Sequence, residues 1–146
     1  ILMNNVGIML TKQGRLAEAE TLYRETLAAW RAEDGDRAPN TLVALGNLAY
    51  NLREQGKLAE AEPLFREAVA AGREVSGNDA VATMQAVGNL GRVLLAQGKL
   101  VEAEPLLVEA VAWTRKKQGS GGPYNGALVE LRRMQGRLAE AEQELG

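Results

Sequence analysis

Apolar residues along the chain recur at the three- and four-residue spacing of α-helices. One such stripe runs through Leu42, Leu45, Leu48 and Leu52, and a second stripe follows Gly56. A glycine between two stripes accepts the positive φ angle at which a helix ends. The pattern therefore predicts a hairpin of two helices joined by a tight turn at Gly56.

The hairpin pattern repeats along the chain. The dipeptide Gln-Gly recurs, and the phrase after it reads RLAEAE from Arg15, KLAEAE from Lys57, KLVEAE from Lys99 and RLAEAE from Arg137. The steps between the dipeptides are 42, 42 and 38 residues (55 − 13, 97 − 55 and 135 − 97). A fixed period of this length is typical of stacked repeats. The sequence predicts one domain of four hairpins, the last one shortened, over residues 1–40, 41–82, 83–122 and 123–146.

The turn residues give the expected helix bounds. First helices are expected near residues 1–13, 40–55, 82–97 and 125–135. Second helices are expected near residues 16–32, 58–74, 100–116 and 138–145. Gly35, Gly77 and Gly119 are expected to close the second helices. Pro63 and Pro105 lie inside second helices, where we expect a slight kink or a late start of regular hydrogen bonding.

Composition narrows the class of function. The chain has 146 residues, no Cys, no His and a formal net charge of −2. It therefore lacks a thiolate nucleophile, a disulfide and the commonest metal ligands. It has neither a basic block for phosphate backbones nor an apolar run of about 18 residues. We expect no enzyme activity, no catalytic residues, no cofactor or metal, no nucleic-acid or membrane partner and, without a signal peptide, a cytoplasmic location.

The two ends of the chain are apolar and uncapped. Ile1, Leu2 and Met3 open the sequence, and no polar capping helix follows Leu145. Terminal repeats of helical arrays usually carry a polar outer face. The ends therefore predict end-to-end self-association, and the absence of an initiator Met predicts that the chain is a fragment of a longer protein.

Residues within each unit carry a family resemblance. A small residue follows the turn glycine at Ala19, Ala61, Ala103 and Ala141, and a large residue follows at Tyr23, Phe65, Leu107 and Leu145. With these residues the chain resembles the tetratricopeptide repeat (TPR), whose usual period is 34 residues. The 42-residue period and the phrase QGKLAEAEPLFREAV are similar to the kinesin-light-chain type of TPR. After Gly35 the chain keeps Pro39 but lacks the His that usually precedes it in that type.

The resemblance implies an all-α fold, an α-solenoid of TPR helix-turn-helix repeats that forms a right-handed superhelix. First helices would line its concave groove and second helices its convex surface, with the large residue filling the gap to the next hairpin. It also implies a noncatalytic protein–protein interaction module that binds a partner peptide in the groove. Two alternatives stay open, a structural or oligomerisation scaffold and a regulatory TPR segment of a larger multidomain protein.

One position of the first helices carries an amide in three of the four units. Eight residues before the Gln of each Gln-Gly stand Asn5, Asn47 and Asn89. The resemblance implies that these amides hydrogen-bond a peptide backbone; the alternative is that they satisfy a neighbouring helix inside the stack. Gly46 and Gly88 precede two of them and fit the close approach of either a ligand or the next helix.

Other first-helix positions vary between units. Tyr50, Arg53, Arg92 and Arg133 offer a ring and charges for specific contacts, or belong to solvated surface. Gln85 completes the candidate groove. Because Gln85 and Asn89 stand where TPR proteins that clamp a C-terminal carboxylate have basic residues, we expect no such clamp.

Pairs of glutamates open the second helices. Glu60 with Glu62 and Glu102 with Glu104 lie in the expected first turns. Residues two apart point in different directions, so these pairs are not expected to act together on a metal or substrate. Negative charge at this end favours the helix dipole, which predicts a structural role.

Overall fold

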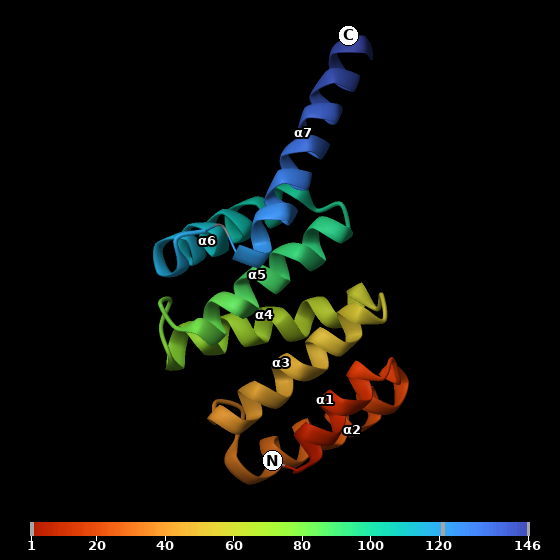
Figure 1. The fold of residues 1–146 in the computed structure, drawn as a ribbon, viewed down its shortest axis with the longest axis vertical. Coiled ribbons are helices and arrows are strands. Elements are labelled where there is room, and N and C mark those ends of the chain that lie inside the picture. The colour runs from red at the N-terminus through yellow and green to blue at the C-terminus, as the bar shows by residue number, and fades with distance from the viewer. Residues whose placement is uncertain (1, 121, 146) are drawn as a thin grey trace. The chain divides into compact units, whose positions relative to one another are not determined.

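The computed structural model describes residues 2–120 and 122–145. In this part of the chain it contains helices and no strand, so the all-α fold is confirmed. The helices are α1 (Leu2–Lys12), α2 (Leu16–Asp34), α3 (Pro39–Glu54), α4 (Leu58–Val75), α5 (Val81–Ala96), α6 (Leu100–Gln118), the short 3-10 helix η1 (Gly122–Tyr124) and α7 (Asn125–Leu145). They form two compact units, residues 1–86 and 87–146, and α5 contributes to both (Figure 1).

The first unit is built from successive helical hairpins. α1 packs against α2, α2 against α3 and α3 against α4 (Figure 1). Gly14 and Gly56 make the turns within the hairpins, each with a φ of 76° that L side chains rarely adopt. In the second unit α6 packs against η1 and α7. The first six helices lie within two residues of the bounds expected from the sequence.

A small residue on the first helix of a hairpin faces a large residue on the second helix. A Cβ atom on Gly7 would lie 2.4 Å from Cε1 of Tyr23, and one on Gly91 would lie 2.8 Å from Cδ2 of Leu107. Ala49 holds the same register in α3 and is fully buried. Tyr23 and Leu107 each pack against the first helix of their own hairpin, because only a small residue at this position of the first helix leaves room for them. That the large residue also fills the gap to the next hairpin stays a prediction.

A buried asparagine that the sequence analysis did not single out joins successive hairpins. Asn51 is fully buried, and its Nδ2 donates to the carbonyl oxygen of Leu16 at 3.1 Å. Its Oδ1 accepts a hydrogen bond of 2.7 Å from Nε2 of Gln55. Nε2 of Gln55 also donates to Oε2 of Glu20 at 2.8 Å. These bonds tie the start of α2 to the end of α3.

Glu20 is the charged member of this junction. Its carboxylate accepts hydrogen bonds from Nζ of Lys57 at 2.8 Å and from Arg24 at 2.9 Å. The hydrogen bond from Lys57, with those from Gln55 and Arg24, lowers the pKa of Glu20 to about 2, although partial burial raises it. Glu18 and Glu20 are the equivalent pair at the start of α2, and Glu20 binds the next hairpin, a role that the helix-dipole argument did not include.

The depressed pKa of Glu20 predicts a pH-dependent contribution to stability. A carboxylate of this kind stabilises the fold above its unfolded pKa, near 4.5, and loses that effect as the pH falls toward 2. We expect Glu20→Gln to lower the free energy of unfolding by about 1–2 kcal/mol at pH 7. The difference in the free energy of unfolding between this variant and the wild type, measured by urea denaturation, should shrink at each step from pH 4.5 to 2.5.

Glu25→Gln provides the control, because it removes the same charge from an exposed site on α2. It should have little effect at any pH. A destabilisation by Glu20→Gln that stays constant down to pH 2.5 would show that the carboxylate charge is not the cause.

The fourth hairpin does not form. α7 is a single helix, and Gln135 and Gly136 lie inside it. Gly14, Gly56 and Gly98 have positive φ angles at the equivalent turns, and Gly136 does not. The prediction of separate helices at residues 125–135 and 138–145 is therefore wrong. A continuous helix keeps its backbone hydrogen bonds through Gly136, at a cost of about 1 kcal/mol for one helical glycine.

The two helical prolines do not delay their helices. α4 begins at Leu58, and the N–H of Ala61 already donates to the carbonyl oxygen of Lys57 at 3.0 Å, ahead of Pro63. α6 shows the same arrangement ahead of Pro105. The late start of hydrogen bonding is therefore wrong, because a proline removes only its own donor and leaves the bonds of the preceding turn in place.

The prediction that a glycine closes each second helix is confirmed at three positions. The φ angles of Gly35, Gly77 and Gly119 are 88°, 84° and 73°. The N–H groups of Gly35 and Gly119 donate back to the carbonyl oxygens of Arg31 and Arg115. The side chains of Ala141 and Leu145, expected at the small and large positions, lie outside the described residues.

Candidate functional site

Most candidate residues of the first unit lie on α1 and α3. Nδ2 of Asn47 donates a hydrogen bond to Oδ1 of Asn4, which joins the two helices. Asn47 is half-buried, whereas Asn5, which follows Asn4 on α1, is exposed. The amide of Asn47 therefore has a partner inside the stack, and Asn5 presents its amide to solvent. We call the surface formed by Asn4, Asn5, Val43, Gly46 and Asn47 the α1–α3 face.

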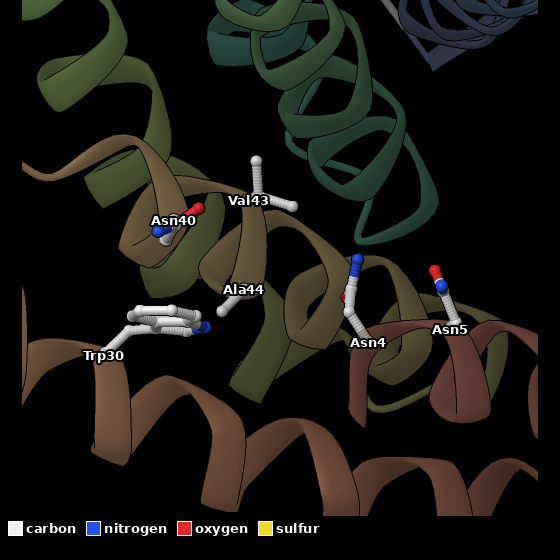
Figure 2. A pocket seen from close by; sticks show the side chains of 6 residues that line it. All are labelled: Asn4, Asn5, Trp30, Asn40, Val43 and Ala44. Atoms are coloured by element: carbon white, nitrogen blue, oxygen red, sulfur yellow. The ribbon is translucent and has the colours of Figure 1, made fainter. Parts of the chain in front are cut away.

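A hollow of about 100 Å³ adjoins this face near the N-terminal ends of α1 and α3. Its lining consists of Asn4, Asn5, Trp30, Asn40, Val43 and Ala44. Figure 2 shows the Trp30 ring of α2 at one end, beside Asn40 and Ala44, and the two asparagines of α1 at the other. Such a volume holds a few water molecules or one side chain. The lining offers amide donors and acceptors together with an indole and a valine, and no charge.

The two glycines of the first helices differ in their surroundings. A Cβ atom on Gly46 would meet no atom within 4 Å. A Cβ atom on Gly88, its equivalent in α5, would lie 2.3 Å from Cε1 of Tyr124. The sequence left open whether a ligand or a neighbouring element approaches these glycines. At Gly88 the neighbour is η1, through Tyr124, and at Gly46 the surface is open.

The C-terminal part of α3 carries an aromatic ring and a cation. The guanidinium carbon of Arg53 lies 4.6 Å from the centroid of the Tyr50 ring, and an Nη of Arg53 lies 2.7 Å from Glu54. The Arg53 side chain is 15% exposed, whereas Tyr50 is 42% exposed. The charge of Arg53 is thus held by internal partners, and Tyr50 is the accessible member of the pair.

Charge separates the first helices from the second helices. α1, α3 and α5 together contain one acidic residue, Glu54. The second helices contain five in α2, four in α4 and three in α6. The α1–α3 face therefore offers amide and apolar groups without negative charge, which suits the uncharged backbone of a peptide.

The remaining candidate residues lie on α5 and α7. Gln85 is exposed in the first unit, and Asn89 is half-buried in the second. Arg92 donates to the carbonyl oxygen of Pro123, and its guanidinium carbon lies 5.0 Å from the centroid of the Tyr124 ring. Arg92 thus helps to hold η1 against α5.

Arg133 lies on α7 in the second unit. Its guanidinium lies 2.9 Å from the carboxylate of Glu130, one turn earlier in the helix, and its side chain is 57% exposed. The pair is a surface ion pair of the kind that contributes little to stability.

Of the six residues that line the hollow, the sequence analysis selected only Asn5 as a candidate. Trp30 and Asn40 were not singled out, and neither was Asn4. A signal was present in the repeat alignment, because Asn4 replaces the glycine that the next two units carry as Gly46 and Gly88. A departure from the repeat on a first helix marks a surface that one unit does not share with the others.

Comparison with known proteins identifies the family. The sequence profile described as tetratricopeptide repeat matches residues 1–74 and again residues 43–116. The chain belongs to the tetratricopeptide repeat family, whose arrays are protein–protein interaction modules. No protein with a curated description is significantly similar to it.

Two solved structures show the type of repeat. The TPR-like repeats of a protein assigned as a kinesin light chain from Podosopora anserina match with a TM-score of 0.83 and 22% identity, over 95% of this chain and 68% of that one. BtubC from P. vanneervenii matches with a TM-score of 0.82 and 18% identity, over 97% of this chain and 58% of that one. At the level of the fold, the kinesin-light-chain type of repeat is confirmed. Among the described helices, none is long and apolar enough to cross a membrane.

Proposed function

We propose that the chain binds an extended peptide segment of a partner protein on the α1–α3 face. The observation that carries this proposal is the uncharged hollow beside the exposed Asn5, in a surface that leaves Gly46 open. Membership of the tetratricopeptide repeat family supports it, because these arrays act generally as noncatalytic scaffolds for protein partners.

The peptide backbone would run along the asparagines. The amide of Asn5 offers a donor and an acceptor, which matches the two hydrogen-bonding groups of a peptide unit. Asn47 has one amide hydrogen engaged by Asn4 and retains its carbonyl oxygen as an acceptor for the ligand. Without a Cβ, Gly46 allows a ligand backbone to reach van der Waals distance of α3.

The hollow would take one side chain of the peptide. Trp30 and Val43 provide apolar contact, and Asn4 and Asn40 provide hydrogen bonds. A charged group would lose its hydration there without meeting an opposite charge, which is costly. The best fit is a side chain with an apolar stem and an uncharged polar end.

The other candidate residues of the first unit would flank this contact. In the first unit, Tyr50 offers its exposed ring, Arg53 positions that ring, and Gln85 offers a further amide. In the second unit, we assign peptide contact to Asn89 and Arg133, as expected from the repeat position. Arg92 takes a positioning role there through its bond to Pro123.

The test is a selection of peptides from a displayed random library on the wild-type chain. We expect enriched peptides to bind Asn5→Ala/Asn47→Ala about 5- to 150-fold more weakly, because two neutral hydrogen bonds contribute about 1–3 kcal/mol. Affinities would be measured by fluorescence anisotropy. Gln143→Ala, which removes an exposed amide from α7, should bind as the wild type does.

Folding of each variant is checked by thermal unfolding in circular dichroism. If no peptide is enriched, or if the enriched peptides bind the double variant as tightly as the wild type, the asparagines serve only the stack and the proposal fails.

A further inference from the structure

The solvent-facing side of α6 is apolar. Four exposed residues, spaced four, three and four positions apart, share this side of the helix: Val101, Pro105, Val108 and Ala112. Val101 is 87% exposed and Val108 is 41% exposed. We call these four residues the α6 stripe.

The same side is exposed in all three second helices, α2, α4 and α6. The equivalent exposed residues of α2 are Ala17, Thr21, Arg24 and Ala28. Those of α4 are Ala59, Pro63, Arg66 and Ala70. The stacking of hairpins therefore leaves this side of a second helix open, and the exposure of the α6 stripe is a property of the hairpin rather than of its place in the array.

Val108 replaces the arginine of the other two second helices. Arg24 of α2 and Arg66 of α4 stand at this position, and each forms an ion pair with a glutamate one turn earlier in its own helix. In α6 that glutamate is Glu104, which pairs instead with Arg132 of α7. Of the three second helices, α6 is therefore the one whose exposed stripe carries no charge, and its burial would be favourable.

The charges of α6 are separated along the helix. Its acidic residues all lie within the first ten positions: Glu102, Glu104 and Glu109. Its last turn carries three exposed basic residues, where α2 and α4 have one basic residue each: Arg115, Lys116 and Lys117. Two antiparallel α6 helices would place the acidic half of each beside the basic end of the other, whereas a parallel pair would bring like charges together.

We propose that two copies of the chain associate through the α6 stripe, with their α6 helices antiparallel. One self-complementary patch on each copy forms the interface, so the assembly closes as a dimer. With Val108 at the twofold axis, Pro105 of each copy lies beside Ala112 of the other. Glu102 and Lys116 are 14 residues apart, about four turns, and so lie along one edge of the stripe. Across the axis, Glu102 of each copy meets Lys116 of the other.

The interface consists of a single pair of helices. α6 has 19 residues and is about 28 Å long, which places the interface at the small end of the range for protein complexes. We expect a weak dimer, with a dissociation constant on the order of 100 µM. The inference goes beyond peptide binding and does not depend on it, because the α6 stripe belongs to the second unit and the α1–α3 face to the first.

Sedimentation equilibrium of the 146-residue chain from about 10 µM to about 1 mM tests the proposal. The weight-average mass of the wild type is expected to rise from near 15.7 kDa toward twice that value. Val108→Arg should stay monomeric, and it should fold, because the other two second helices carry arginine at this position. Val75→Arg replaces a valine of α4 that is 48% exposed and should dimerise as the wild type does.

A charge exchange tests the antiparallel arrangement. Glu102→Lys and Lys116→Glu should each weaken the dimer about 10-fold at low salt, because each substitution brings like charges together at both ends of the interface. Glu102→Lys/Lys116→Glu should regain the affinity of the wild type. If the double variant stayed as weak as either single variant, the antiparallel arrangement would be wrong.

A single cysteine tests the position of the twofold axis. The chain has no cysteine, so Val108→Cys introduces one thiol, and oxidation should give a disulfide-linked dimer. Arg66→Cys, at the equivalent position of α4, is the matched control and should stay monomeric. A monomeric wild type across the series, or equal cross-linking of the two cysteine variants, would overturn the proposal and leave the α6 stripe to a partner of different sequence. Association through the ends of the chain would also overturn it, because Val108→Arg would then associate as the wild type does.

Discussion

Replacement of Phe65 by alanine is expected to lower the free energy of unfolding by about 3–5 kcal/mol. Phe65 is 2% exposed and stands on α4 at the position where Tyr23 of α2 meets a glycine of its own hairpin. The substitution removes a ring from between two packed helices. The cavity persists because α3 and α4 remain joined by their turn at Gly56. Urea denaturation followed by circular dichroism measures the change.

Phe65→Leu is the matched control. The third hairpin uses Leu107 at this position, fully buried against Gly91. Leucine should therefore fit with a loss below about 1.5 kcal/mol. Equal stability of the alanine and leucine variants would show that the large residue is not needed in the hairpin core.

A methyl group at Gly88 is expected to destabilise the second unit by about 2–3 kcal/mol. The added Cβ atom would lie 2.3–2.6 Å from three atoms of the Tyr124 ring, well inside van der Waals contact. Either the ring or η1 must move, which also weakens the contacts of Arg92 with Tyr124 and Pro123. The free energies of unfolding of Gly88→Ala and of the wild type measure this cost.

Two further variants test whether the contact with the Tyr124 ring causes the destabilisation. In a Tyr124→Ala background, Gly88→Ala should lose most of its effect, because the ring that it meets is gone. Gly46→Ala should raise stability by about 0.5–1 kcal/mol, since its added methyl group meets nothing and alanine favours the helix. If Gly88→Ala and Gly46→Ala changed the free energy of unfolding in the same direction, the difference in their surroundings would be contradicted.

The fold was predictable from sequence because its determinants are local and repeated. The turn glycines and the buried Ala19, Ala61 and Ala103 occupy the expected places in three hairpins. The fourth hairpin was mispredicted from the same phrase, RLAEAE, which starts α2 after Gly14 and lies inside α7 after Gly136. A glycine permits a turn without requiring one, and the packing available to the following helix decides.

The candidate site was predictable only in part. The periodicity drew attention to Asn5 and Asn47, which do lie on the α1–α3 face. It could not locate the hollow, because four of its six lining residues do not repeat. Trp30 and Asn40 are replaced by Gly72 and Ala82 in the next unit. A repeat analysis identifies what the hairpins share, whereas this site is formed where they differ.

The hydrogen bond between Asn4 and Asn47 was not predictable either. The sequence argument weighed a ligand against the stack for each amide separately. The structure pairs two asparagines from neighbouring first helices, so one amide hydrogen of Asn47 serves the stack while Asn5 stays exposed. The spacing of 43 residues between the partners falls outside the 42-residue register, which compares only equivalent positions.

The most direct test of the α1–α3 face is the affinity of a selected peptide for Gly46→Ala, measured by titration calorimetry beside the wild type. This variant is expected to be more stable than the wild type, so a loss of binding cannot come from unfolding. Peptide binding at this face predicts an affinity at least about 10-fold lower, because the methyl group occupies the path of the ligand backbone. An affinity equal to that of the wild type would contradict the account and place the ligand elsewhere.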